Sequence, residues 1–250
     1  MSRSLAARDL RRVRRYPSTT VHLLFLPIFF VVVWSRGFSE VARLEGFPAR
    51  NFLDWIAPLA ILNGCTASAL ICGFVLARDL EGGFFERLLL APVRPVAVVG
   101  GALLSGLARA AVPFVVVTSA AVVFGADLPG GALGLLAEAV AAAGIALCAV
   151  GWAVGLALRL RGIRRSVHLM QTGVACTLYL STGLAPLSFM TGWMRGVAQV
   201  NPMTQVLRLA RQGYLGPTTW AQTWPGLVVL AAGVALLTWF AVRGLKGLTP

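Results

Sequence analysis

The sequence predicts an all-α membrane protein with six transmembrane helices. Of its 250 residues, 58% are hydrophobic and only 12% are charged, and the mean hydropathy is +0.79. A soluble domain carries roughly twice that charged fraction. The apolar residues gather in long runs, and a run of about 20 residues suffices to cross a bilayer as a helix. We therefore expect one transmembrane domain over residues 1–250.

The chain begins with a basic segment, residues 1–17, that predicts an amphipathic helix lying on the membrane surface. Leu5, Leu10 and Val13 form a weak apolar stripe among arginines. Such a helix is attracted to anionic lipid headgroups. A signal peptide also begins with basic residues, but no A-x-A cleavage site follows the first apolar run and several more runs do. We therefore expect an interfacial helix rather than a signal peptide.

Six apolar runs follow. Spans 1 to 5 are expected within residues 18–187 and span 6 within 224–243, with an outer helical region at 188–223. The five earlier spans are predicted at Ser18–Ser35, Trp55–Leu76, Val96–Phe124, Ala132–Leu158 and Ser166–Leu187. Gly151 and Gly155 form a G-x-x-x-G pattern in span 4, which permits close packing against a neighbouring helix.

The densest run of both charge signs, Ala77–Pro95, lies between spans 2 and 3; we call it the charged segment. Helical spacing gives it an apolar face and a polar face, which predicts a short helix at the water interface. Gly82 and Gly83 weaken the first part of this helix, and Pro92 and Pro95 end it. The apolar face holds Phe84, Phe85, Leu88 and Leu89, and the polar face holds Arg78, Asp79, Glu81, Glu86 and Arg87. Two interpretations remain open, an ordinary interfacial loop and a surface that binds a soluble partner.

A second amphipathic helix is expected between spans 5 and 6, after a short half-buried helix near Ser188–Trp193. Asn201 is a favourable N-cap, and Pro202 suits the first turn. Apolar residues then alternate at helical spacing with Arg208, Arg211 and Gln212, and Gly213 or Gly216 ends the helix. The pattern predicts a helix lying on the outer face.

The distribution of basic residues predicts the orientation in the membrane. Of the 22 Lys and Arg residues, fifteen fall on the side that bears the N-terminus and six on the other side. The positive-inside rule therefore places both termini and the charged segment in the cytoplasm of a multi-pass plasma-membrane protein. Because the arginines follow membrane edges, we do not expect nucleic-acid binding. Five tryptophans then gather at the outer interface: Trp34, Trp55, Trp193, Trp220 and Trp224.

Two ionisable residues, Arg109 and Glu138, fall within predicted spans 3 and 4. Charges inside a membrane are costly and usually face protein or water. The functional interpretation is a polar patch on a substrate path, or a mutual pair. The structural interpretation is a link between helices, or an arginine that reaches toward water.

The sequence lacks the motifs of an enzyme. The only lysine, Lys246, stands outside any G-x-x-x-x-G-K-[ST] phosphate loop, and no G-x-S-x-G or H-x-x-x-H is present. The four cysteines lie in apolar runs without a CxxC pair, so neither a metal site nor a disulfide is indicated. If ATP drives this protein, another chain must hydrolyse it.

Two segments resemble the ABC-2 type permeases of ABC transporters. The charged segment is similar to the loop between their second and third spans, although Phe84 and Phe85 replace the more usual Thr-Leu pair. The matching residues there are Arg78, Asp79, Glu81, Gly83, Glu86, Arg87, Leu88, Leu89 and Pro92. The second match is Asn201-Pro202-Met203-Thr204, followed by Gly213-Tyr214-Leu215-Gly216, ahead of the last span.

The resemblance implies the permease subunit of an ATP-driven exporter for an amphipathic small molecule such as a drug or antibiotic. It implies two permease chains, identical or sister, over two ATPase subunits that bind ATP and Mg, with no cofactor on this chain. It assigns ATPase coupling to residues 78–87, namely Arg78, Asp79, Glu81, Gly82, Gly83, Phe84, Phe85, Glu86 and Arg87. It assigns an outer gate to Asn201, Pro202, Arg208 and Arg211.

Three alternatives remain open. The same architecture could export a lipid-linked glycan. An ion-coupled secondary transporter would be expected to use acidic residues near the bilayer midplane, where Glu138 alone and off centre serves poorly. The third alternative is a membrane scaffold without transport.

Overall fold

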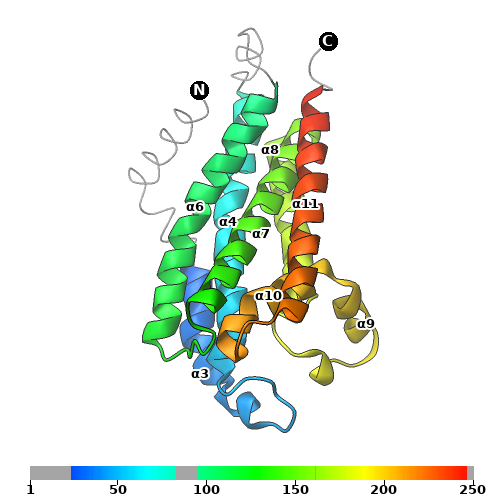
Figure 1. Ribbon diagram of the computed structural model, residues 1–250. Coiled ribbons are helices and arrows are strands. Elements are labelled where there is room, and N and C mark those ends of the chain that lie inside the picture. Colours follow the sequence, from blue (N-terminus) through cyan, green and yellow to red (C-terminus); the bar gives the residue numbers. More distant parts are fainter. Residues whose placement is uncertain (1–23, 83–94, 161, 247–250) are drawn as a thin grey trace.

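The computed structural model describes residues 24–82, 95–160 and 162–246, and the regular structure in these ranges is helical (Figure 1). Within these ranges, four helices are long and apolar enough to cross a membrane. They are α4 (Phe52–Glu81), α6 (Pro95–Val123), α7 (Gly131–Leu160) and α11 (Trp220–Lys246), and they run alongside one another as a bundle. An all-helical, multi-span membrane fold is thus confirmed.

Two of the six predicted spans do not correspond to any of these four helices. The first corresponds to an apolar helix at Leu24–Gly37, which includes the π-helical turn η1 (Phe30–Trp34) and α3 (Ser35–Gly37). The N-terminal interfacial helix and the start of this span lie outside the described residues. The fifth corresponds to α8 (Ile163–Tyr179), whose 17 residues rise about 26 Å.

Helix α8 ends well before the predicted boundary at Leu187. Leu180 caps it, and the chain then turns through Ser181 and Gly183 toward Pro186. The Ser181 hydroxyl donates to the Leu178 carbonyl and accepts from the Gly183 backbone N–H, which stabilises a turn in place of further helix. Proline at 186 then opposes any helical continuation.

Helix α7 occupies the centre of the bundle, with α4 and α11 as its most extensive neighbours (Figure 1). The predicted G-x-x-x-G pattern faces α11. A Cβ atom on Gly151 would lie 2.8 Å from the Leu237 carbonyl carbon, and one on Gly155 would lie 2.2 Å from the Phe240 ring. Only glycine permits helices to approach this closely, so the packing interpretation of this pattern is confirmed.

The shorter elements gather at one end of the bundle, which we call the α10 end (Figure 1). It holds α3, the short helix α9 (Gly192–Val200) and α10 (Pro202–Leu215), with the 3₁₀ turn η3 (Leu187–Phe189) between α8 and α9. The C-terminal end of α11 lies at the opposite end, together with the last turn of α4.

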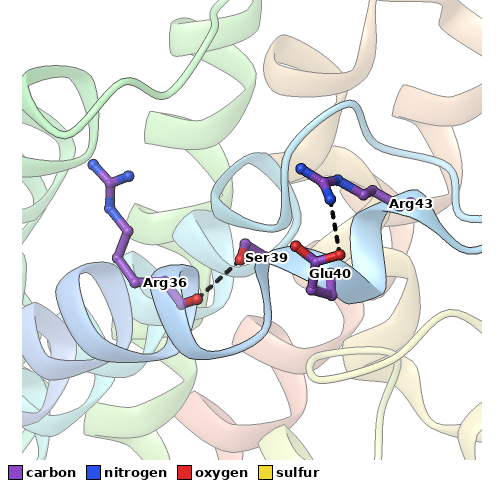
Figure 2. A network of polar contacts seen from close by, with 4 residues as sticks. All are labelled: Arg36, Ser39, Glu40 and Arg43. Atoms are coloured by element: carbon purple, nitrogen blue, oxygen red, sulfur yellow. Dashed lines mark hydrogen bonds and ion pairs between the residues drawn. The ribbon is translucent and has the colours of Figure 1, made fainter.

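The loop before α4 carries an exposed polar network around the 3₁₀ turn η2 (Ser39–Arg43), shown in Figure 2. The Ser39 hydroxyl donates to the Arg36 carbonyl at 3.0 Å, and Arg43 pairs with Glu40 at 3.0 Å. Both charged side chains are largely exposed, so this ion pair contributes at most about 1 kcal/mol. These contacts stabilise the local conformation of the loop.

Candidate functional site

The first charged residues of the charged segment belong to the last turn of α4. Arg78, Asp79 and Glu81 continue the helix, and Gly82 caps it by donating its backbone N–H to the Arg78 carbonyl at 3.0 Å. Helix α4 therefore extends beyond the predicted end of span 2 at Leu76 and includes the first residues of the charged segment. Gly83, Phe84, Phe85, Glu86 and Arg87 lie outside the described residues.

Glu81 links α4 to α8. Its Oε1 atom accepts a hydrogen bond from the Ile163 backbone N–H at 2.6 Å. Ile163 is the first residue of α8, and the N-cap residue Gly162 offers no side-chain acceptor. A carboxylate beside the first N–H groups of a helix is favourable because these groups lack partners and carry partial positive charge. Helix α8 thus receives its N-terminal acceptor from another helix.

Asn201 begins α10 as predicted and also joins it to α8. Its Oδ1 atom accepts from the Met203 backbone N–H at 2.9 Å, and Pro202 occupies the first turn. The same side chain donates from Nδ2 to the Thr177 carbonyl near the end of α8, at 2.9 Å. The helix start is confirmed, and the cap provides a tertiary contact that the sequence did not reveal.

Arg211 is not a surface residue, contrary to the prediction. Its side chain is only 2% exposed, and its guanidinium stacks on the Trp55 ring at 3.7 Å. Its Nε donates to the Trp55 carbonyl at 3.0 Å, and its two terminal nitrogens donate to the Thr182 and Gly183 carbonyls at 2.7 Å each. Arg211 therefore holds α10 against the start of α4 and the turn after α8, whereas Arg208 remains exposed.

Most of helix α10 is buried against the bundle, although Pro202, Arg208 and Leu215 are exposed. Its middle and C-terminal half, including Gln212, are covered by the bundle. Gln212 exchanges hydrogen bonds with the Thr223 hydroxyl and accepts from the Thr219 backbone N–H at 2.9 Å, which fixes the turn into α11. The amphipathic pattern arises because Arg211 and Gln212 find buried partners, not because they face water.

Gly213 lies inside α10, which ends at Leu215 with Gly216 as its cap. A Cβ atom on Gly213 would lie 2.8 Å from Gly134 Cα, and the Gly213 carbonyl accepts from the Gly130 backbone N–H at 3.0 Å. The two helices α7 and α10 therefore cross backbone to backbone at this glycine pair.

Glu138 contacts Tyr214 of the neighbouring helix α10. Glu138 is fully buried on α7, and its Oε2 atom lies 3.2 Å from the Tyr214 hydroxyl of α10. Its other carboxyl oxygen has no hydrogen-bond partner among the described residues. Arg109 is half-buried on α6. Of the open interpretations, the link between helices fits Glu138 best.

Helix α8 is consequently held at both ends by other helices. Glu81 of α4 contacts its first residue, and Asn201 and Arg211 of α10 contact its last turn and the turn that follows. Sequence reasoning missed this arrangement, because the backbone acceptors at Thr177, Thr182 and Gly183 leave no side-chain signal.

An apolar cavity of about 400 Å³ opens beside α8, between α4, α7, α10 and α11. Its lining is mostly aliphatic and includes Trp152 and Met203, with Thr66 and Thr177 as polar members. A cavity of this size and character can accept the apolar part of a small organic molecule. Within the described ranges, no group of three or more His, Cys, Asp or Glu side chains could hold a metal ion.

Comparison with known proteins shows which family the chain belongs to. Residues 2–215 match the model of the family described as "ABC-2 type transporter". The chain is 21% identical to a daunorubicin resistance ABC transporter permease protein of Streptomyces coeruleorubidus, over 94% of this chain and 81% of that one. It is 25% identical to a probable doxorubicin resistance ABC transporter permease protein of Mycobacterium tuberculosis, over 92% of this chain and 82% of that one.

The family match covers most of the chain and includes the charged segment and the Asn201-Pro202-Met203-Thr204 motif. Permeases of this family lack an ATPase domain and carry no cofactor, and they work with ABC ATPase partners. This chain therefore belongs to the ABC-2 type transporter family and is a multi-pass membrane permease.

Proposed function

We propose that this chain is the permease subunit of an exporter that moves an amphipathic, drug-like or antibiotic-like molecule out across the plasma membrane. The observation that carries the proposal is the similarity to drug-resistance permeases over 92% or more of the chain. The apolar cavity beside α8 supports it, because its few polar groups and aromatic ring suit the apolar part of such a cargo.

The proposed assembly has two permease chains and two ATPase subunits, with both termini of the permease in the cytoplasm. The excess of basic residues on the side of the charged segment supports this orientation. The charged segment is then the surface that the ATPase contacts.

The contacts of α8 support a route from the ATPase to the cargo. Movement of the charged segment would displace the last turn of α4, and Glu81 would transmit that displacement to the start of α8. At the other end, Asn201 and Arg211 would pass it to α10. Since α8 and α10 both line the apolar cavity, the same displacement would reshape it.

Reconstitution tests the proposal directly. The permease and its ATPase are placed together in inside-out vesicles, and uptake of doxorubicin is measured with ATP, without ATP, and with a proton gradient alone. We expect uptake that requires both chains and ATP. Uptake driven by the gradient alone would support an ion-coupled transporter instead. If a lipid-linked glycan stimulates ATP hydrolysis and doxorubicin is not transported, the cargo is the glycan rather than a drug.

A further inference from the structure

A second cavity, of about 410 Å³, lies at the α10 end of the bundle and is separate from the apolar cavity. Its walls come from the loop before α4, the turn after α8, η3, and the exposed side of α10. Arg208 and Arg211 both line it, and none of its described lining residues is Asp or Glu. The cavity is therefore positively charged.

The charge of Arg211 is not neutralised by a carboxylate within the described part of the chain. Its three hydrogen bonds go to neutral carbonyl oxygens, and a guanidinium has five N–H groups. Two of its N–H groups thus remain for another acceptor. Arg208, at the rim, is exposed and makes no hydrogen bond or ion pair with the described residues.

Two further buried donors border the same cavity. The indole Nε1 of Trp55 and the hydroxyl of Thr182 are both buried without a hydrogen-bond partner among the described residues. Trp55 is 6% exposed and Thr182 is 4% exposed. Buried polar groups are normally paired, so two such donors beside a buried, uncompensated cation indicate a missing acceptor.

We propose that this cavity binds an oxyanion, the phosphate or carboxylate of an amphipathic molecule. Arginine suits such groups because its planar N–H fork matches two oxygens. Apolar lining from Pro186, Leu187 and Leu215 would contact the adjoining carbon chain. Trp193 and Trp220, both more than 70% exposed at this end, suit a headgroup zone.

Native mass spectrometry of the detergent-purified permease tests this site. Retention of phosphatidylglycerol is compared with retention of zwitterionic phosphatidylcholine, and each is repeated with R208Q. Arg208 is chosen because it is exposed, whereas replacing Arg211 would also disturb packing. The matched control is R195Q, an exposed arginine of α9 that does not line the cavity. We expect wild type and R195Q to retain phosphatidylglycerol preferentially, and R208Q to bind it about fivefold more weakly.

Inorganic phosphate distinguishes the two sources of the oxyanion. If inorganic phosphate displaces bound phosphatidylglycerol from the wild-type protein, a free ion can occupy the site. If only added phosphatidylglycerol displaces it, the site requires an intact lipid headgroup. Either result supports the oxyanion site. Equal retention of the two lipids by wild type, or an equal loss in R208Q and R195Q, would overturn it.

Discussion

At the scale of single residues, the position of Arg211 depends on its partners rather than on its charge. Arginine is a common residue at membrane edges, where it reaches toward water. Here three backbone carbonyls and an aromatic ring replace that water. Hydrogen bonds to a charged group contribute more than neutral ones, which offsets part of the desolvation of the guanidinium.

We expect Arg211→Gln to destabilise the permease by about 3 kcal/mol, because the carbonyls of Trp55, Thr182 and Gly183 would lose charged donors while remaining buried. The measurement is the unfolding free energy in detergent, followed by tryptophan fluorescence. Arg208→Gln is the control, because it removes the same charge from an exposed position of the same helix. A loss of the same size in both variants would show that the buried contacts contribute nothing.

At the scale of helices, close backbone approaches determine how α7 and α10 cross. Gly134 and Gly213 face each other, and each leaves no room for a side chain on the other. The obstructing atoms are backbone atoms, so a rotamer change cannot relieve a clash. The crossing therefore depends on glycine at both positions.

Gly213→Ala should lower the unfolding free energy by about 2 kcal/mol, since an added Cβ forces the two helices apart. Gly196→Ala in α9 is the matched control. A Cβ there meets nothing within 4 Å, so that variant should be neutral or slightly stabilising. Thermal melts of the two purified variants make the comparison, and a stable Gly213→Ala protein would contradict the crossing.

The contact between α4 and α8 predicts how substitutions of Glu81 affect the coupling of ATP hydrolysis to transport. Glu81→Ala removes the acceptor for the Ile163 N–H, whereas Glu81→Gln keeps a carbonyl oxygen there. If movement of α4 reaches α8 through this contact, Glu81→Ala should lower the amount transported per ATP hydrolysed by about tenfold. Glu81→Gln should retain most of the wild-type value. The measurement is doxorubicin uptake and phosphate release in the same vesicles. Equal coupling in the two variants would exclude this route.

At the scale of the whole molecule, the two ends of the bundle differ in chemistry. The α10 end carries exposed tryptophans and the cavity with two arginines, and the opposite end carries Arg78 and the start of α8. Trp55 is an exception among the predicted interfacial tryptophans, because it is buried beneath Arg211. The positive-inside rule predicts that the α10 end is the outer one.

Cysteine labelling in whole cells tests that orientation. In a background without the native cysteines, Arg208→Cys should react with a membrane-impermeant maleimide from outside, and Arg78→Cys only after permeabilisation. Both positions are exposed at opposite ends of the bundle. Ala153→Cys, on a fully buried position, should remain unlabelled in either case. Labelling of Arg78→Cys in intact cells would show that the orientation is the reverse of the predicted one.

Several features could be predicted from the sequence by itself because they depend on neighbouring residues. The long apolar runs identify α4, α6, α7 and α11, since a bilayer requires continuous hydrophobic length. The start of α10 is equally local, because the Asn201 side chain reaches an N–H two residues away. Both motifs that resemble ABC-2 permeases also lie within single short segments.

Only the tertiary structure decided which polar residues face water. The helical pattern of α10 is the same whether Arg211 meets solvent or protein, and its partner Trp55 lies 156 residues away in the chain. Backbone carbonyls at Thr182 and Gly183 complete the contact, and such acceptors exist at nearly every residue, so no motif marks them. The fold brings them together because α8 ends at Tyr179 and the carbonyls of the turn that follows it point toward Arg211 of α10.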